Sequence, residues 1–299
     1  MCQNPGMPSL PVNFGLLPDV QSAYATSRIV VLPVPFERTV SYGRGTAGGP
    51  AAILRASQSM ELYDEELRFE PAGIGIATLP PFLPEAFDLA AAMDELETEC
   101  RRHLEAGKFL LTLGGEHSLT IAPVRAAKRV HADIGVIQFD AHADLRDEFE
   151  GTIYSHAAVM RRVADEGLPT LPIGIRSLSA PEAEFAHEAG VPIVWGHELA
   201  ELDDERFDRL LAALPEKVYL TFDIDYFDPS LVPATGTPEP GGGAWYPTLR
   251  LLSRIFETKQ VVAMDLVELA PIGGQPSSDF VAAKLAYKCL GYFARRSLA

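Results

Sequence analysis

The sequence predicts an α/β protein, a parallel sheet with helices on both faces. Short apolar or β-branched runs alternate with longer segments of helical periodicity, the pattern of a parallel sheet covered by helices. Several of the short runs end in polar residues, as strands do at the sheet edge where ligands bind. At 299 residues the chain exceeds the usual domain length, but large α/β sheets reach it as one unit. We therefore interpret residues 1–299 as a single domain with a three-layer α/β/α architecture.

The elements follow from this alternation in chain order. The predicted strands are short apolar runs: Ile29 to Val34, Phe109 to Leu113, Ile134 to Phe139, Thr170 to Ile175, Ile193 to Trp195, Val218 to Ile224 and Val261 to Leu266. The predicted helices have apolar residues at helical spacing: Pro50 to Ser57, Leu89 to Leu104, Leu119 to Ala127, His156 to Ala164, Ala180 to Ala189, Glu205 to Leu214, Pro247 to Thr258 and Ser278 to Phe293. The Pro- and Gly-rich segment from Pro229 to Gly243 is predicted to be an active-site loop.

The charge balance argues against nucleic acid as a partner. The chain has 41 Asp and Glu residues against 25 Lys and Arg, a formal net charge of −16. Its basic residues form no cluster longer than a pair such as Arg101 and Arg102, whereas nucleic-acid-binding surfaces are strongly basic.

The cysteines and the first residues predict a cytoplasmic protein. Cys2, Cys100 and Cys289 have the spacing of neither a disulfide framework nor a zinc site, which fits a reducing compartment. Met1 to Asn13 lack the charged and apolar regions of a secretion signal. No apolar run approaches the ~18 residues that span a membrane.

Ligand-type side chains alternate at the end of one predicted strand. Asp140, His142 and Asp144 follow the run Ile134 to Phe139 at every second position, and a period of two directs all three to the same side. Two carboxylates and one imidazole suit Mn²⁺ or another first-row divalent ion. The alternative is a surface turn in which the aspartates act as caps.

A second pair of carboxylates ends the run that begins at Val218. Asp223 and Asp225 point one way, and a cation would relieve their repulsion at a buried strand terminus. The alternative is that they cap the following turn, the role we assign to Asp228.

A glycine pair and a histidine follow a third predicted strand. Gly114 and Gly115 permit a tight turn and leave His117 at the mouth of the next helix. A lone histidine is more often structural than a ligand. Three strand ends of one sheet nevertheless offer six candidate metal ligands, which are His117, Asp140, His142, Asp144, Asp223 and Asp225. Because carboxylates bridge ions, this set predicts two metal ions that share a hydroxide nucleophile.

These motifs resemble those of the ureohydrolases, the arginase and agmatinase family. The resemblance rests on Gly114 to Ser118, on Asp140 to Asp144, and on Asp223 to Pro229 continuing to Pro233 and Gly241. It covers roughly Leu32 to the C-terminus, and the segment Ser41 to Pro50 resembles the family's early substrate-side loop. It implies an arginase-like fold and hydrolysis of a guanidino compound to urea and an amine.

The resemblance also implies a cofactor, two Mn²⁺ ions per subunit, with Ni²⁺ and Co²⁺ as alternatives. By this resemblance His117, Asp140, Asp144 and Asp223 would hold the first ion. The second would be held by His142, Asp140, Asp223 and Asp225, with Asp140 and Asp223 bridging.

The resemblance further implies the catalytic positions. His156 falls where the family keeps a proton-transferring histidine, and Glu268 where a carboxylate meets the guanidinium. Asp144 is counted with them. Ala157 departs from the glycine that usually follows that histidine, and Thr221 stands where the third motif commonly has serine.

The loop after the Asp-x-His-x-Asp motif suggests the substrate. It is acidic, and Asp147 and Glu150 would attract an amine and repel a carboxylate. Agmatine is therefore predicted first, with putrescine and urea as products. N-aminopropylagmatine, guanidinobutyrate and arginine are the alternatives. Arg176 resembles a family position that orients a site carboxylate or ties subunits together.

Two other classes of function remain as alternatives. A deacetylase of arginase-like fold would need only one metal, which the presence of both His117 and His142 disfavours. A non-catalytic scaffold would have a broken ligand set. The family usually forms trimers or hexamers, and we expect a homo-oligomer on that resemblance alone.

Overall fold

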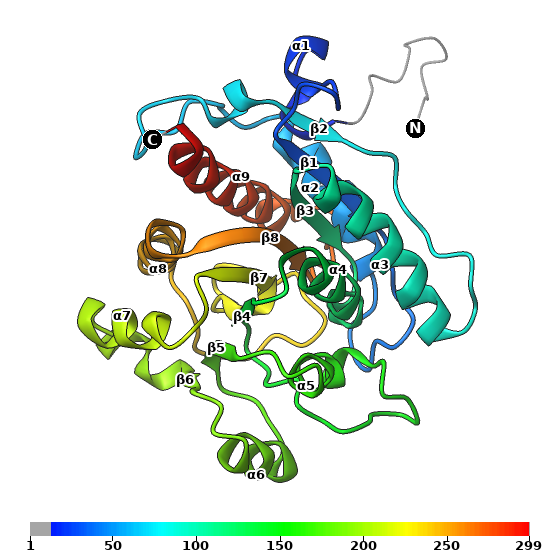
Figure 1. The fold of residues 1–299 in the computed structure, drawn as a ribbon, viewed down its shortest axis with the longest axis vertical. Helices are drawn as coiled ribbons and strands as arrows, with labels where there is room; N and C mark the ends of the chain where they lie inside the picture. Colours follow the sequence, from blue (N-terminus) through cyan, green and yellow to red (C-terminus); the bar gives the residue numbers. More distant parts are fainter. Residues whose placement is uncertain (1–12, 299) are drawn as a thin grey trace.

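The computed structural model describes residues 13–298, which form one sheet of eight parallel strands between helices (Figure 1). The strand order is β2-β1-β3-β8-β7-β4-β5-β6. The strands are β1 Ile29–Val34, β2 Ile76–Thr78, β3 Phe109–Gly114, β4 Gly135–Phe139, β5 Thr170–Ile175, β6 Val194–Trp195, β7 Lys217–Asp223 and β8 Gln260–Val267. The predicted fold class, a parallel sheet with helices on both faces, is confirmed.

All seven predicted strands are present, with small shifts at their ends. Ile134, Ile193 and Ile224 lie just outside the strands to which they were assigned. The edge strand β2 was not predicted.

The helices also match their predicted positions to within a few residues. They are α1 Asp19–Ser22, α2 Gly49–Ser57, α3 Leu89–Glu105, α4 Ile121–His131, α5 Val159–Asp165, α6 Ala180–Glu188, α7 Asp204–Ala212, α8 Trp245–Thr258 and α9 Ser277–Leu298. Helix α1 was not predicted. Two predicted helices begin with a 3-10 turn, His117–Thr120 before α4 and His156–Ala158 before α5. Both turns carry a histidine that the sequence analysis assigned to the site.

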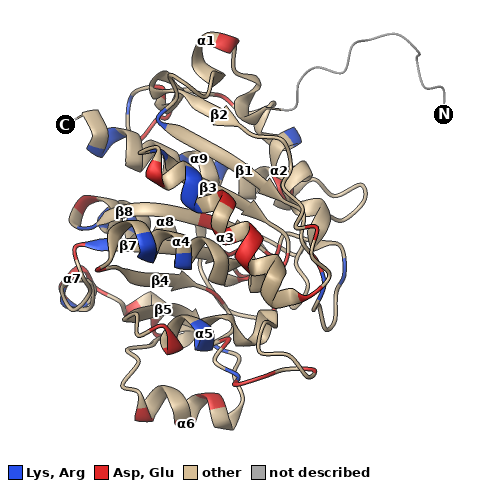
Figure 2. Ribbon diagram, turned by 45° about the vertical axis from the view of Figure 1, so that its right-hand side comes forward, with Lys and Arg blue, Asp and Glu red and all other residues tan. Residues whose placement is uncertain are grey.

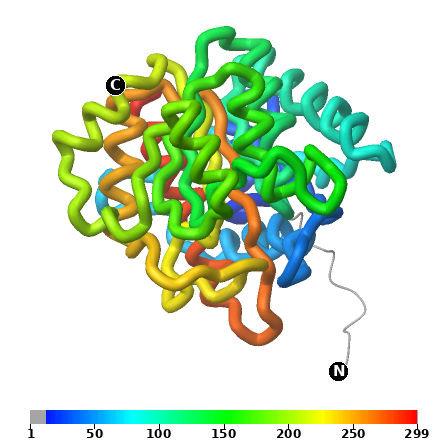
Figure 3. The backbone as a smooth tube through the Cα atoms, turned by 90° about the horizontal axis from the view of Figure 1, so that it is seen from below, coloured from blue at the N-terminus to red at the C-terminus, as the bar shows by residue number. Residues whose placement is uncertain are grey.

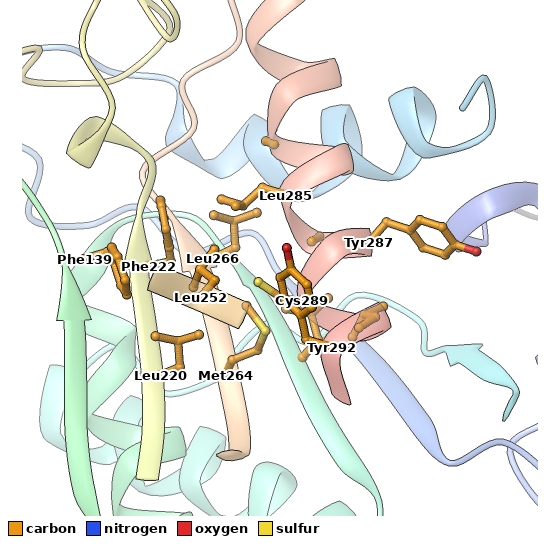
Figure 4. Packing of buried hydrophobic residues seen from close by; sticks show 14 of the residues in the cluster. Phe139, Leu220, Phe222, Leu252, Met264, Leu266, Leu285, Tyr287, Cys289 and Tyr292 are labelled. Carbon is orange, nitrogen blue, oxygen red and sulfur yellow. The ribbon is translucent and has the colours of Figure 1, made fainter. Parts of the chain in front are cut away.

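The hydrophobic core lies on both faces of the sheet because side chains alternate along each strand. Ile29 and Val31 belong to the cluster that includes residues of α2, α8 and α9, whereas Val30 and Leu32 belong to the cluster with α3 and α4. Figure 4 shows the first cluster, where residues of α9 such as Leu285 pack beside Leu220, Phe222 and Leu266 of β7 and β8. The central strands are therefore held from both sides.

Loops at the carboxyl edge of the sheet meet one another. Figure 3 shows the segments near residues 40, 235 and 270 gathered on one side of the molecule. The Gly43 amide donates to the Gly236 carbonyl at 3.1 Å, and the Ala270 amide to the Ala234 carbonyl at 3.0 Å. A Cβ atom at Gly115 would lie 2.0 Å from the Phe36 carbonyl oxygen, so only glycine fits this crossing.

Surface charges pair rather than gather by sign on the face seen in Figure 2. There the basic residues of α4 lie beside acidic residues of α3, and Arg129 pairs with Glu97. Lys128 pairs with Glu166 at 2.9 Å. Within residues 13–298, no helix is long and apolar enough to cross a membrane. Cys100 and Cys289 are free and buried, and Cys2 lies outside the described residues.

Candidate metal centre

Four neighbouring strands, β3, β8, β7 and β4, deliver the candidate site at their carboxyl ends. His117 follows β3, Asp140 follows β4, Asp223 ends β7 and Glu268 follows β8. The same edge contains a cavity of about 250 Å³. It is lined by His117, His142, Asp144, His156, Asp223, Asp225 and Glu268, among other residues.

His117 provides the first test of whether a cation fits. Its side chain is 1% exposed, and its Nδ1 atom has no hydrogen-bond partner. Nδ1 lies 3.1 Å from a carboxylate oxygen of Asp140, 3.0 Å from Asp144 and 3.5 Å from Asp223. A buried nitrogen without a partner, surrounded by three carboxylates, has the arrangement of a metal ligand set.

A second group of ligands lies beside the first. Nδ1 of His142 is 2.9 Å from Asp225 and 3.6 Å from Asp140. The ligand atoms of His117, Asp140 and Asp223 all lie within 4.8 Å of one another, and so do those of Asp140, His142 and Asp225. Since Asp140 belongs to both groups, its two oxygens are placed to serve two ions.

Asp144 is directed to the site by its backbone conformation and not by the side-chain alternation of a strand. Strand β4 ends at Phe139, so residues 140–144 are not part of a strand. Asp144 instead has a left-handed backbone with φ 53°, a conformation that is costly for a residue other than glycine. This conformation is stabilised by α5, because the amides of Met160 and Arg161 donate to the Asp144 carbonyl at 3.0 and 3.1 Å.

The charges at the site favour a cation. Burial, and then the charges of Asp225 and Asp140, raise the pKa of Asp223 well above its usual range. Burial opposes a charge on His117, but Asp140 and Asp144 raise the pKa of this histidine well above its usual value. The crowded carboxylates thus favour a positive charge at Nδ1, and a divalent ion would supply it.

The other ring nitrogen of His117 is oriented by a buried network. Nε2 lies 2.9 Å from Oγ1 of Thr221, and that hydroxyl donates to Asp265 at 2.7 Å. Because the only hydroxyl hydrogen of Thr221 is given to Asp265, Thr221 accepts a hydrogen bond from Nε2–H. This tautomer leaves the lone pair of Nδ1 directed at the carboxylates.

Glu268 lies beside the same cluster. It is buried, it has a left-handed backbone with φ 64°, and one of its carboxylate oxygens accepts the His117 amide at 2.6 Å. Burial raises the pKa of Glu268 to about 8. A cationic guanidinium in the cavity would favour the ionised carboxylate.

His156 lines the cavity at its outer side. Its Nδ1 lies 3.3 Å from the hydroxyl of Thr39 and its Nε2 3.3 Å from the hydroxyl of Ser41. The ring of Phe149 meets it edge to face at 5.8 Å between centroids. Burial lowers the pKa of His156 below its usual value, which favours the neutral imidazole.

Asp147, Glu150 and Arg176 are not among the residues that line the cavity, although Phe149 of the same loop is. Asp147 faces α5 and accepts a hydrogen bond from Arg162 at 3.1 Å, and Glu150 lies in a tight turn with φ 50°. The Arg176 guanidinium donates to several backbone carbonyls, including those of Asp225 at 2.8 Å and Glu239 at 3.0 Å. Arg176 therefore ties the 225–240 segment to the end of β5.

Several residues at or near the cavity were not predicted as site residues, and four of them bear on its chemistry. Arg146 and Glu182 line it, with Arg146 Nε 3.7 Å from a Glu182 carboxylate oxygen. The Thr39 hydroxyl lies 3.3 Å from Nδ1 of His156 and donates to Glu116 at 2.8 Å. A glutamate between a glycine pair and a ligand-type histidine was a signal for Glu116, because a charged residue in such apolar surroundings needs partners.

Comparison with known proteins agrees with this geometry. Residues 27–291 match the Arginase family. The chain is 44% identical to the N(1)-aminopropylagmatine ureohydrolase of Synechocystis sp., over 91% of each protein, and 34% identical to the agmatinase of Pyrococcus horikoshii, over 89% of this chain and 92% of that protein. The crystal structure of agmatine ureohydrolase of Thermoplasma volcanium superimposes with a TM-score of 0.83 at 30% identity, over 94% of each chain. The protein therefore belongs to the arginase family, as a ureohydrolase that acts on guanidino C–N bonds.

Proposed function

We propose that this protein hydrolyses a guanidino compound that ends in an amine, either N(1)-aminopropylagmatine or agmatine, to urea and the corresponding polyamine. The observation that carries the proposal is the partnerless Nδ1 of His117, which faces three carboxylates in a cavity. Agmatine was the substrate predicted first from the sequence. The 44% identical relative named for the aminopropyl derivative, compared with 34% for an agmatinase, favours the longer substrate.

Two manganese ions are the proposed cofactors, with Ni²⁺ or Co²⁺ as alternatives. His117, Asp140, Asp144 and Asp223 would hold one ion, and His142, Asp140, Asp223 and Asp225 the other. When bound, such a pair lowers the pKa of water and supplies a hydroxide near neutral pH. The proposal is supported by the two groups of ligand atoms that share Asp140.

Glu268 and His156 are proposed to act on the substrate itself. A carboxylate recognises a planar guanidinium through paired hydrogen bonds, and Glu268 lies beside the ligands in the same cavity. His156 would deliver a proton to the leaving amine, since an amine is expelled more readily once protonated. Its place on the wall of the same cavity as the candidate ligands and Glu268 supports this role.

The distal amine is proposed to approach Glu182 rather than the acidic loop. Glu182 lines the cavity, whereas Asp147 does not line it and pairs with Arg162. The Glu182 carboxylate accepts the Ser179 amide and hydroxyl, both at 2.7 Å, and so is fixed in place. Arg146, which lies beside Glu182, would limit the space available to the cationic amine of the substrate.

The experiment that tests this function is urea release by Mn²⁺-loaded protein from five compounds, with metal content measured on the same sample. The compounds are N(1)-aminopropylagmatine, agmatine, guanidinobutyrate, arginine and guanidine. A preference for the first two supports the proposal, and their ratio identifies the substrate. Equal or better turnover of guanidinobutyrate or arginine would reject the amine-terminated class, and no urea from any compound would reject the ureohydrolase reaction.

The assembly, the compartment and the domain division stay predictions. We propose a trimer or hexamer of a chain that forms one domain and acts in the cytoplasm. A sedimentation experiment that finds only a 32.5 kDa species would refute the oligomer.

A further inference from the structure

Glu116 is a buried carboxylate that belongs to neither group of ligand atoms. It is completely buried between Gly115 and His117, and its oxygens face the loop after β1. They accept the backbone amides of Arg38 and Thr39, the Thr39 hydroxyl at 2.8 Å and the Ser118 hydroxyl. So many donors to one carboxylate fix its position and the position of Thr39.

The hydroxyl of Thr39 connects this carboxylate to His156. Oγ1 of Thr39 accepts the His156 backbone amide at 3.1 Å and lies 3.3 Å from the ring nitrogen Nδ1. A threonine hydroxyl has one hydrogen, and here it is given to Glu116. Thr39 can therefore only accept from the ring, so the interaction requires a hydrogen on Nδ1.

The opposite side of the ring has the complementary arrangement. Nε2 of His156 lies 3.3 Å from the hydroxyl of Ser41, which lines the cavity and has a hydrogen to donate. Ser155 is a competing partner, since its hydroxyl lies 3.4 Å from Nδ1. The Thr39 contact is shorter, and its polarity is set by a charged acceptor, whereas the Ser155 hydroxyl makes no hydrogen bond to a carboxylate.

We propose that Glu116, acting through Thr39, is a positioning residue that holds neutral His156 as the Nδ1–H tautomer and leaves the lone pair of Nε2 toward the cavity. This inference rests on the proposed function for the identification of His156 as the group that moves a proton. Nε2 takes one proton from water in the cavity to form the imidazolium and later gives that proton to the leaving amine, while Nδ1–H stays bonded to Thr39. The negative charge of Glu116 lies on the side where the imidazolium charge develops.

The first test reads the tautomer directly by ¹⁵N spectroscopy of the histidine rings. The protein is loaded with a diamagnetic divalent ion and held at about pH 8, above the usual histidine pKa of about 6.5. The chain has seven histidines, so the signals lost in His156→Asn identify the residue. We expect a protonated Nδ1 in the wild type and a mixture or the reverse tautomer in Thr39→Val. An Nε2–H form in the wild type would overturn the inference, whatever the activity.

The second test measures turnover of Mn²⁺-loaded variants. Thr39→Val keeps the shape of the side chain and should lower kcat about tenfold or more, with KM and metal content within about twofold of the wild type. Thr39→Ser should restore kcat. The matched control is Thr46→Val, because Thr46 is a buried threonine of the same loop whose hydroxyl donates to Glu37 and not to the His156 network.

A pH profile separates positioning from loss of structure. Burial lowers the pKa of His156, whereas the charge of Glu116 and a hydrogen bond to the Thr39 backbone oppose that shift. Thr39→Val removes the hydroxyl that lies 3.3 Å from Nδ1 and would accept its hydrogen, so the acidic limb of kcat should move to lower pH, which a loosened loop alone would not cause. Wild-type kcat and an unmoved limb in Thr39→Val would refute the inference. Absence of urea release by the wild type would refute only the proposed function, because the ¹⁵N spectrum still decides the tautomer.

Discussion

Thr221→Val is expected to weaken metal binding without touching a ligand. The Thr221 hydroxyl lies between Nε2 of His117 and Asp265, at 2.9 and 2.7 Å. Valine has the same shape but no hydroxyl, so Nε2–H would be left buried without a partner at a cost of about 1–3 kcal/mol. This cost destabilises the ring orientation of His117 that metal binding needs, so it weakens metal binding. Each 1.4 kcal/mol corresponds to about a tenfold change in affinity. We therefore expect one of the two ions to bind about tenfold to a hundredfold more weakly, the range known for partners of metal ligands.

The assay is competition with a chelator of known affinity, followed by metal analysis of the protein. Thr221→Ser keeps the hydroxyl and should bind both ions like the wild type. Thr112→Val is the matched control, since Thr112 is equally buried on β3 but its hydroxyl has no hydrogen-bond partner. Wild-type affinity for both ions in Thr221→Val would show that this network does not orient His117.

Three other perturbations separate the roles of the site and the scaffold. Asp140→Ala should lose both ions and all activity, whereas His156→Ala should keep its metal and lose about 10² in kcat; equal metal loss in both would remove the distinction. Because burial lowers the pKa of His156, the acidic limb of the wild-type pH profile should lie below the usual value, and a limb above it would contradict that assignment. Lys288 is buried, and its Nζ atom lies 3.0 Å from a carboxylate oxygen of the buried Asp64. Lys288→Met should therefore lower the free energy of unfolding, measured by urea denaturation, by about 3 kcal/mol. A change under about 1 kcal/mol would show that Asp64 does not need this partner.

Periodicity predicted the central strands because their buried side chains come from near-continuous apolar runs. Strand β2 escaped prediction since Ile76–Thr78 is only three residues long at the sheet edge. This strand forms because it pairs with β1, and no local sequence pattern indicates that pairing. The ligand-type residues were recognisable from their spacing, but the left-handed backbone of Asp144 was not, because it depends on amides of α5 far along the chain.

Charges in loops were the least predictable feature. The sequence around Asp147 suggested an acidic surface for the substrate, which stays a prediction, and its pairing with Arg162 of α5 could not be predicted from that pattern. Glu182 is close to the cavity because α6 is, a fact of tertiary structure that residue type does not indicate. Arg176 illustrates the same limit, since its five-donor guanidinium is used by backbone carbonyls and not by a carboxylate.

The position of β8 has a consequence for how the protein is made. It is the last strand of the chain, yet it lies between β3 and β7 in the middle of the sheet. A nascent chain that stops before Gln260 would hold β1 to β3 and β4 to β7 as two sheets without a shared neighbour. His117 would then be on one of them and the five aspartate and histidine ligand candidates on the other. During synthesis, which proceeds from the N-terminus, the candidate ligand set is therefore complete only after β8 joins the two halves, and until then His117 is separated from the aspartates that surround its Nδ1 atom.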